Sequence, residues 1–150
     1  MPLSFKCVPF QQLTLRELYD LLALRAEVFV VAQNCPFQDP DGKDFEAWHC
    51  LGTNDAGQLV AYTRLFDQNL VYPGFASIGR VVTSPHARAA GAGRQLMHVS
   101  IDYCQKLFGQ KPIKIGAQTY LLRFYESLGF ASTGEEYLED TILHTTMIRP

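Results

Sequence analysis

The most informative segment of the chain is Arg88-Ala89-Ala90-Gly91-Ala92-Gly93, which separates a predicted strand from a predicted helix. Glycine permits positive φ angles and leaves room for a ligand to approach the backbone. The amides that open the following helix have no partner within it, and with the helix dipole they form an anion site. Arg88 and Arg94 can add charge-assisted contacts. The segment therefore predicts a pyrophosphate-binding loop, with a plain strand-to-helix turn as the alternative.

Two other phosphate-binding motifs do not fit this loop. A P-loop requires G-x-x-x-x-G-K-[ST], and the chain contains no such string. A dinucleotide fingerprint requires a third glycine where this chain has Leu96, and it belongs in a first β-α unit. Here the loop lies in the middle of the chain, after a predicted hairpin. The pattern that remains is R-x-x-G-x-G.

The hydrophobic pattern on both sides of the loop predicts a protein that contains strands and helices. Thr14 and Glu17 have the spacing of a capping box, and apolar residues at helical spacing follow them. A long loop with a functional role is expected over 32–45. We expect helices over 15–30, 97–108 and 120–128, and strands over 5–9, 47–53, 58–66, 75–82, 113–117, 130–137 and 142–148. This order predicts an α/β (α+β) fold, with a mixed sheet in a single domain covering 1–150.

Composition excludes several classes of protein. The chain has 47% hydrophobic and 19% charged residues and a net charge of −2, which is typical of a globular domain. Without a basic excess we expect no nucleic-acid partner. No apolar run approaches the roughly 18 residues of a membrane span, and the first residues do not resemble a signal peptide. We therefore expect a cytoplasmic protein without a membrane partner.

The cysteines do not indicate a metal site. None of the four is in a C-x-x-C pair, so we expect reduced and mostly buried thiols. The Asp39-x-Asp41-Gly42 string lacks the ligands of a calcium loop, because Phe37 and Trp48 occupy ligand positions. Its carboxylates are interpreted as loop caps, or as a polar rim that attracts a cationic amine. We expect no metal. The cysteines are Cys7, Cys35, Cys50 and Cys104.

A second motif, Phe124-Tyr125-Glu126-Ser127-Leu128-Gly129-Phe130, follows the glycine loop by about 30 residues. R-x-x-G-x-G followed by F-Y-x-x-x-G-F resembles the GNAT superfamily of N-acetyltransferases, whose glycine loop binds coenzyme A. The alternative for Tyr125 is core packing on a short helix. The resemblance implies a mostly antiparallel, twisted sheet flanked by helices.

Further segments resemble the ElaA-like branch of that superfamily, and the likeness covers almost the whole chain. They include Leu24-Arg25-Ala26-Glu27-Val28-Phe29-Val30-Val31, Ile78-Gly79-Arg80-Val81-Val82, Ala117-Gln118 and Glu139-Asp140-x-Ile142-x-His144. Two departures occur. Ala32 stands where the branch commonly has Glu, and Thr141 and Leu143 stand where Gly and Pro are common.

The resemblance implies transfer of an acetyl group from acetyl-CoA to an amine in a ternary complex. The pantetheine arm would pair with the strand 78–82 as an added strand, and the Val81 amide or a neighbour would polarise the thioester carbonyl. Tyr125 would act as general acid toward the leaving thiolate. The residues implied in cofactor binding are Ile78, Arg80, Val81, Val82, Arg88, Ala89, Ala90, Gly91, Ala92, Gly93, Arg94, Gln118 and Tyr125.

The sequence leaves the acceptor side open. A water chain, or an amine that arrives neutral, can replace a protein base. A non-catalytic acyl-CoA-binding module and an enzyme that uses ATP or NAD are the rival functions, and a homodimer stays open. The candidates for an acceptor contact or a general base are Asp44, Glu46, His49, Asp140 and His144.

Overall fold

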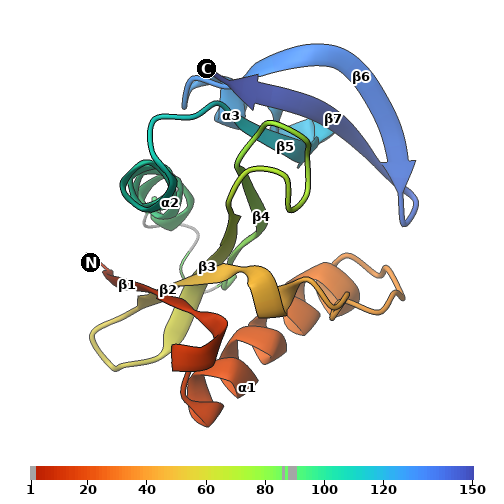
Figure 1. Ribbon diagram of the computed structural model, residues 1–150. Helices are drawn as coiled ribbons and strands as arrows, with labels where there is room; N and C mark the ends of the chain where they lie inside the picture. The colour runs from red at the N-terminus through yellow and green to blue at the C-terminus, as the bar shows by residue number, and fades with distance from the viewer. Residues whose placement is uncertain (1–2, 86, 88–90) are drawn as a thin grey trace.

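The computed structural model describes residues 3–85, 87 and 91–150, so Arg88, Ala89 and Ala90 of the predicted loop lie outside the described residues. Its strands and helices follow one another along the chain as Figure 1 shows. The strands are β1 (Ser4–Pro9), β2 (Trp48–Thr53), β3 (Leu59–Phe66), β4 (Ser77–Thr83), β5 (Ile113–Gln118), β6 (Ala131–Glu139) and β7 (Ile142–Arg149), and the α-helices are α1 (Leu15–Arg25), α2 (Ala92–Phe108) and α3 (Leu122–Glu126).

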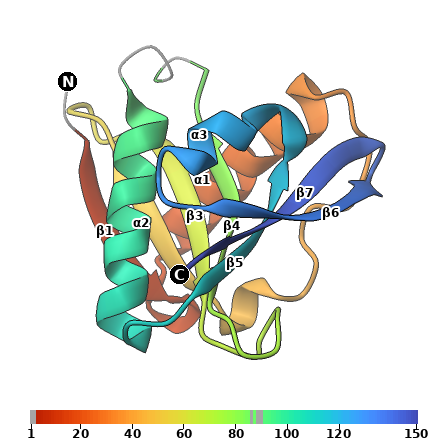
Figure 2. The same ribbon diagram turned by 90° about the horizontal axis from the view of Figure 1, so that it is seen from above.

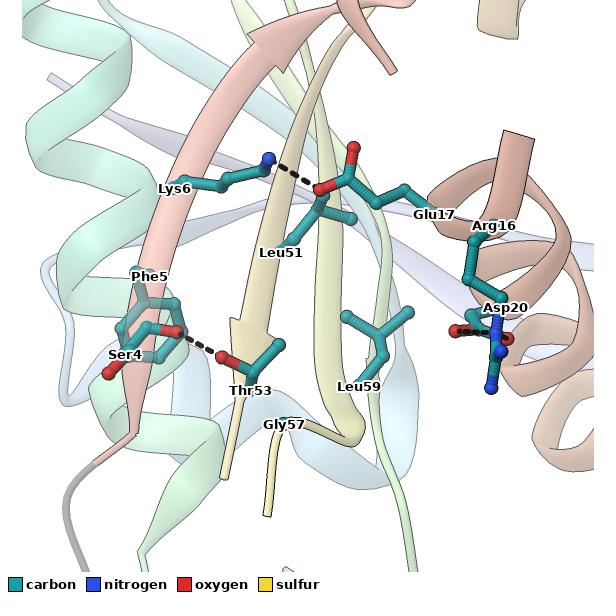
Figure 3. Close-up of a pocket in the computed structure, with 10 residues that line it drawn as sticks. All are labelled: Ser4, Phe5, Lys6, Arg16, Glu17, Asp20, Leu51, Thr53, Gly57 and Leu59. Carbon is teal, nitrogen blue, oxygen red and sulfur yellow. Dashed lines mark hydrogen bonds and ion pairs between the residues drawn. The ribbon is translucent and has the colours of Figure 1, made fainter. Parts of the chain in front are cut away.

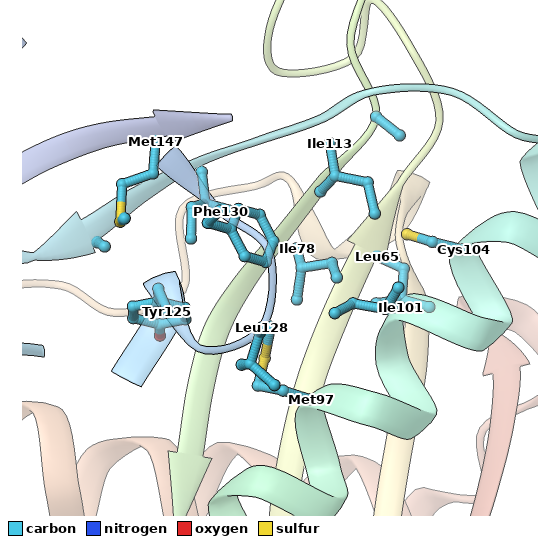
Figure 4. Close-up of a cluster of buried hydrophobic side chains, with 13 residues drawn as sticks. Leu65, Ile78, Met97, Ile101, Cys104, Ile113, Tyr125, Leu128, Phe130 and Met147 are labelled. Atoms are coloured by element: carbon cyan, nitrogen blue, oxygen red, sulfur yellow. The ribbon is translucent and has the colours of Figure 1, made fainter. Parts of the chain in front are cut away.

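The first sheet is antiparallel, in the order β1-β2-β3-β4, and helices cover both of its faces. Side chains alternate between the faces along a strand. On one face, Tyr62 and Val82 pack with Leu21 and Leu24 of α1. On the other face, Leu65 and Ile78 pack with Met97 and Ile101 of α2 (Figure 4). The central strands are therefore buried on both sides, which fixes the path of β4.

The second sheet is also antiparallel, in the order β5-β7-β6. A parallel bridge between Ala76 and Ile113 joins it to the first sheet. There the Ala76 amide donates to the Pro112 carbonyl at 3.2 Å, and the Lys114 amide donates to the Ala76 carbonyl at 2.9 Å. Beyond the bridge β4 and β5 diverge, as Figure 2 shows. One edge of β4 is consequently left without a neighbouring strand.

The predicted α/β class is confirmed, but the single mixed sheet is in fact two antiparallel sheets that meet at a parallel bridge. Hydrophobic alternation predicts strands one by one, whereas the divergence of β4 and β5 depends on pairing between distant segments. The predicted helix over 15–30 also changes character, because α1 ends at Arg25 and a π-helical segment (Ala26–Ala32) continues it. π-Helical segments are rare in proteins, and those that occur often lie at functional sites.

Local signals at the helix ends agree with the structure. The Thr14 side chain accepts from the Glu17 amide at 3.0 Å, and the Glu17 carboxylate accepts from the Thr14 amide at 2.9 Å, which completes the predicted capping box. Gly109 ends α2 with φ 93, and Gly129 follows α3 with φ 96. Within the part of the chain that is described, no helix has the length and apolar character needed to cross a membrane.

Candidate functional site

A groove of about 1110 Å³ opens where β4 and β5 diverge. Its lining brings together segments that are distant in sequence: the π-helical segment, β4, the start of α2, α3 and the β6–β7 hairpin. Most of the residues that the sequence predicts as a cofactor site lie along it. Those that are described and line the groove are Ile78, Arg80, Val81, Val82, Gly91, Gly93, Arg94, Gln118 and Tyr125.

The β4 side of the groove offers backbone rather than side chains. Ile78 and Val82 are each 3% exposed, and their side chains belong to the cores on opposite faces of the sheet. Arg80 and Val81 stand opposite the single residue Thr63, because Tyr62 pairs with Val82 and Arg64 pairs with Gly79. This is a β-bulge, which interrupts the hydrogen-bond ladder. The unpaired edge and the bulge leave backbone groups of β4 available to an extended ligand.

Arg80 has an unusual backbone conformation within this bulge. Its φ is 49°, in the left-handed region. The other non-glycine residues with positive φ in the described parts of the chain lie in turns: Asn34, Asn69, Asp140 and Thr141. A strained backbone of this kind costs about 1–3 kcal/mol and persists where the surrounding structure enforces it.

The start of α2 forms the second wall of the groove. Gly91 is the N-cap, with φ 71, so the predicted need for positive φ is met at this position. The first hydrogen bond of the helix joins the Gln95 amide to the Gly91 carbonyl at 3.2 Å. The amides of Ala92, Gly93 and Arg94 therefore have no acceptor within the helix, and they can serve an anion.

Gly93 leaves space beside the backbone at the start of α2, and Arg94 places a positive charge near it. A Cβ atom added at Gly93 would meet only the Phe124 ring, at 3.8 Å, which is ordinary van der Waals contact. The protein's own packing therefore permits a side chain at this position, and the glycine is explained better by a ligand that lies close to the backbone. The exposed Arg94 donates to the Ser127 hydroxyl at 2.9 Å.

Tyr125 lies at the groove with its ring in the core. The ring packs edge-to-face against Phe124 at 5.1 Å and Phe130 at 6.0 Å between centroids. Burial, with a smaller contribution from Tyr120, raises the pKa of Tyr125 to about 12. No hydrogen bond joins its hydroxyl to any other group in the described residues. The side chain is thus a neutral phenol whose proton is free for a ligand in the groove.

The segment after the π-helix crosses the groove and contacts the second sheet. Gln33 and Gln118 exchange side-chain amide hydrogen bonds of 3.2 and 3.4 Å. The Cys35 thiol donates to the Asp140 carbonyl at 2.9 Å. Gln118 is therefore placed at the groove as predicted, but its amide binds Gln33. These contacts join the two halves of the groove at the end away from α2.

That end of the groove carries acidic and aromatic groups. His144 stacks on Tyr137 with ring centroids 5.4 Å apart. Its Nδ1 lies 2.8 Å from the Ile142 carbonyl, and a carbonyl only accepts, so Nδ1 carries the proton. Its Nε2 lies 3.8 Å from a Glu139 carboxylate oxygen. Of the predicted acceptor-side residues, Asp140 and His144 line the groove.

The structure does not bring the other three acceptor-side candidates to the groove lining. Glu46 is exposed in a short 3-10 turn (Asp44–Glu46). His49 is fully buried: its Nε2 donates to the Asp44 carbonyl at 2.9 Å, and its Nδ1 accepts from the Tyr62 hydroxyl at 2.6 Å. Burial lowers the pKa of His49, so the ring is neutral. Both ring nitrogens are engaged within the protein, and His49 is not placed to take a proton from a ligand.

Asp44 belongs to an alternating ring of three arginines and three aspartates. Arg25 contacts Asp39 and Asp44 at 2.8 and 2.7 Å. Arg64 contacts Asp44 and Asp41 at 3.0 and 2.7 Å. Arg80 contacts Asp39 and Asp41 at 2.7 and 3.5 Å, which closes the cycle.

The contacts of Asp39 and Asp41 decide between the two roles expected for their carboxylates. Asp41 caps the loop as expected, because it accepts from the Lys43 amide at 3.0 Å. Neither carboxylate belongs to a free polar rim, since each is paired with two arginines. The Arg80 guanidinium is paired with Asp39 and Asp41, and a cofactor contact through the Arg80 backbone stays a prediction. Hydrogen bonding to Arg64 is the main cause that holds the pKa of Asp41 below its usual range. No spacing in the sequence signals these partners, because they come from α1, β3, β4 and the loop between α1 and β2.

A second, smaller cavity of about 390 Å³ lies between β1, β2, β3 and the start of α1 (Figure 3). Phe5, Leu51 and Leu59 contribute apolar lining. The charged groups at its rim neutralise one another in two ion pairs, Lys6–Glu17 and Arg16–Asp20. It lacks converging unpaired groups, so the groove is the better candidate site. Within the described ranges, no cluster of His, Cys, Asp and Glu is placed to hold a metal ion.

Comparison with known proteins assigns the family. Residues 42–149 match the acetyltransferase (GNAT) domain family. The chain is 43% identical to protein ElaA of Escherichia coli over 143 residues, covering 92% of this chain and 90% of ElaA. The crystal structure of ElaA superposes with a TM-score of 0.90 at 38% identity, covering 99% of both chains. That of an acyl-CoA N-acyltransferase from Pseudomonas aeruginosa gives 0.91 at 43% identity, again over 99% of each.

This chain belongs to the GNAT acetyltransferase family. Within that family it is a relative of ElaA, as the residue patterns in the sequence predict.

Proposed function

We propose that the chain transfers the acetyl group of acetyl-CoA to a primary amine, of a small molecule or a peptide, by direct attack in a ternary complex. One observation carries the proposal: the unpaired edge of β4, the open N-terminus of α2 and the Tyr125 phenol all line one groove. These are the three elements needed to hold a thioester, bind a pyrophosphate and protonate a thiolate.

The coenzyme is placed by two backbone features. The pyrophosphate binds the amides of Ala92, Gly93 and Arg94, helped by the Arg94 side chain. The pantetheine arm lies along β4 and pairs with its backbone, since the side chains of Ile78 and Val82 are buried on either face of the sheet. The thioester carbonyl accepts from an amide of the bulge, at Val81 or a neighbour, and this contact stabilises the oxyanion that develops during attack.

The chemistry then needs two proton transfers. The neutral amine attacks the thioester carbon, a C–N bond forms, and the C–S bond breaks. Because its pKa is raised to about 12, Tyr125 is protonated at neutral pH. It donates this phenolic proton to the departing thiolate and then regains a proton from solvent. After the attack, the nitrogen gives up one proton to His144 Nε2 or to water. Glu139 and Asp140 give this end of the groove a negative charge that attracts a cationic amine before it is deprotonated.

The experiment that tests the proposal is a screen of amines and peptide amines with acetyl-CoA, monitored by release of free thiol and by the mass of the acetylated product. The expected result is thiol release that depends on both enzyme and amine and matches the acetylated product in amount. Tight binding of acetyl-CoA without turnover of any amine would favour the rival function, a non-catalytic acyl-CoA-binding module.

A further inference from the structure

The backbone of Arg80 lies at the centre of the proposed thioester site. It is in the left-handed region, it belongs to a strand rather than a turn, and it forms the β4 bulge with Val81. A non-glycine residue adopts this conformation readily only when its surroundings impose it. The neighbouring strand does not impose it, because the ladder between β3 and β4 is interrupted at the bulge.

The Arg80 side chain supplies the constraint. Its Nε donates to Asp39 Oδ1 at 2.7 Å, and one Nη donates to the Asp39 backbone carbonyl at 2.9 Å. The same Nη lies 3.5 Å from Asp41 Oδ2. Arg80 thus binds both the side chain and the backbone of one residue, and these two hydrogen bonds restrict the positions that its own Cα can take.

Asp39, which binds the Arg80 side chain, is itself held in place by buried contacts. Asp39 is 4% exposed, and its second oxygen accepts from Arg25 Nε at 2.8 Å. Arg25 is fully buried at the end of α1 and also binds Asp44 at 2.7 and 3.2 Å. Arg64 of β3 joins Asp44 to Asp41 and closes the ring. The bulge is therefore tied through Asp39 to a helix and a neighbouring strand.

We propose that Asp39 and Arg80 are positioning residues, which hold the β4 bulge in the conformation that receives the acyl thioester. This inference rests on the proposed function. It assigns the Arg80 guanidinium to the protein's own framework and not to the coenzyme phosphates. The residue works through its backbone, and the ion-pair ring keeps that backbone in place.

Glycine and alanine at position 80 separate this role from a direct contact. Both Arg80→Gly and Arg80→Ala remove the guanidinium, but only glycine adopts positive φ without a steric penalty. Arg80 is the suitable position to change, because Asp39 also pairs with the buried Arg25 and its removal would leave a buried charge without a partner. Arg16→Ala, which removes an exposed ion pair on α1, is the matched control.

The measurements are kcat, KM for acetyl-CoA and amide hydrogen exchange of the segment 77–83 without ligand. We expect kcat of Arg80→Ala to fall at least 10-fold below that of Arg80→Gly, with the two KM values within about threefold. We also expect faster exchange at the bulge in Arg80→Ala than in Arg80→Gly. Arg16→Ala should match the wild type in all three. Equal losses in the two variants, no loss in either, or a larger loss in Arg80→Gly would overturn the proposal.

Failure of the proposed function gives a different result. If the wild type neither binds acetyl-CoA nor releases thiol, the assignment of the reaction fails. Exchange of the segment 77–83 in the wild type and in the two variants needs no ligand, and it still decides whether the ring holds the bulge. Exchange in Arg80→Ala that is no faster than in the wild type would refute the positioning role whatever the reaction is.

Discussion

Replacing Tyr125 with phenylalanine separates its role in packing from its role in proton transfer. The substitution keeps the ring that packs against Phe124 and Phe130. It removes only the hydroxyl, which has no hydrogen-bond partner among the residues that the structure describes. No internal hydrogen bond is lost, so the free energy of unfolding should change by less than about 1 kcal/mol.

The expected effect on catalysis is much larger. General acid catalysis contributes roughly 10²–10⁴-fold. Loss of the proton donor should therefore raise the activation free energy by about 2.7–5.4 kcal/mol, at about 1.36 kcal/mol for each factor of ten in rate. The Kd for acetyl-CoA should change little, because the phenol acts on the thiolate that forms in the transition state. With a pKa of about 12, Tyr125 should not limit the rate on the alkaline side below about pH 11.

The assay is steady-state thiol release with an identified amine, combined with denaturant unfolding of the same preparations. Tyr103→Phe is the control, since Tyr103 is a partly buried tyrosine of α2 outside the groove lining. We expect kcat to fall at least 100-fold in Tyr125→Phe and to stay within about twofold in Tyr103→Phe. A stably folded Tyr125→Phe enzyme with near wild-type kcat would remove Tyr125 from the chemistry.

Three further predictions concern stability. His49 is held neutral, so wild-type stability should fall as the pH drops below about 6.5, by up to about 1.4 kcal/mol per pH unit; urea titrations should show a weaker pH dependence for His49→Gln, and an unchanged one would contradict the buried neutral ring. Burial raises the pKa of Cys104 to about 12, so its thiol should resist alkylation in the folded protein, as judged by intact mass; Cys104→Ser should cost about 1–3 kcal/mol and spare kcat. Gly116→Ala places a Cβ against the Tyr137 hydroxyl and should cost about 1–3 kcal/mol in a thermal melt, whereas a neutral result would argue against that contact.

Short-range patterns predicted much of the fold. The capping box at Thr14 and Glu17, the helix stops at Gly109 and Gly129, and the strand positions follow from local signals, and each is present in the structure. The π-helical segment over 26–32 was missed, because its apolar spacing is close to that of an α-helix. The division into two sheets was also missed, since β4 and β5 diverge beyond the bridge between Ala76 and Ile113 and no local pattern specifies where their pairing ends.

The candidate site was predicted unevenly for a related reason. Its coenzyme side consists of contiguous motifs, and Gly91, Gly93 and Tyr125 of those motifs line the groove. The acceptor side and the ion-pair ring depend on contacts between distant residues. Asp44 and His49 are polar residues near a predicted cleft, but the fold buries both and supplies their partners from elsewhere. Polarity alone cannot distinguish a buried ion-pair network from a reactive site.

We propose that the groove binds acyl-CoA with its pyrophosphate at the start of α2, and a titration of acetyl-CoA followed by thermal shift tests this binding mode. At about 100 times the Kd, one bound ligand should stabilise the fold by roughly 2.7 kcal/mol. Gly93→Glu should fold normally, because a Cβ there makes only ordinary contact, yet its carboxylate beside the phosphates should abolish the shift. We expect saturable stabilisation at one site by acetyl-CoA, with none by NAD or ATP. A shift no larger than that given by NAD, or one that persists in Gly93→Glu, would contradict it.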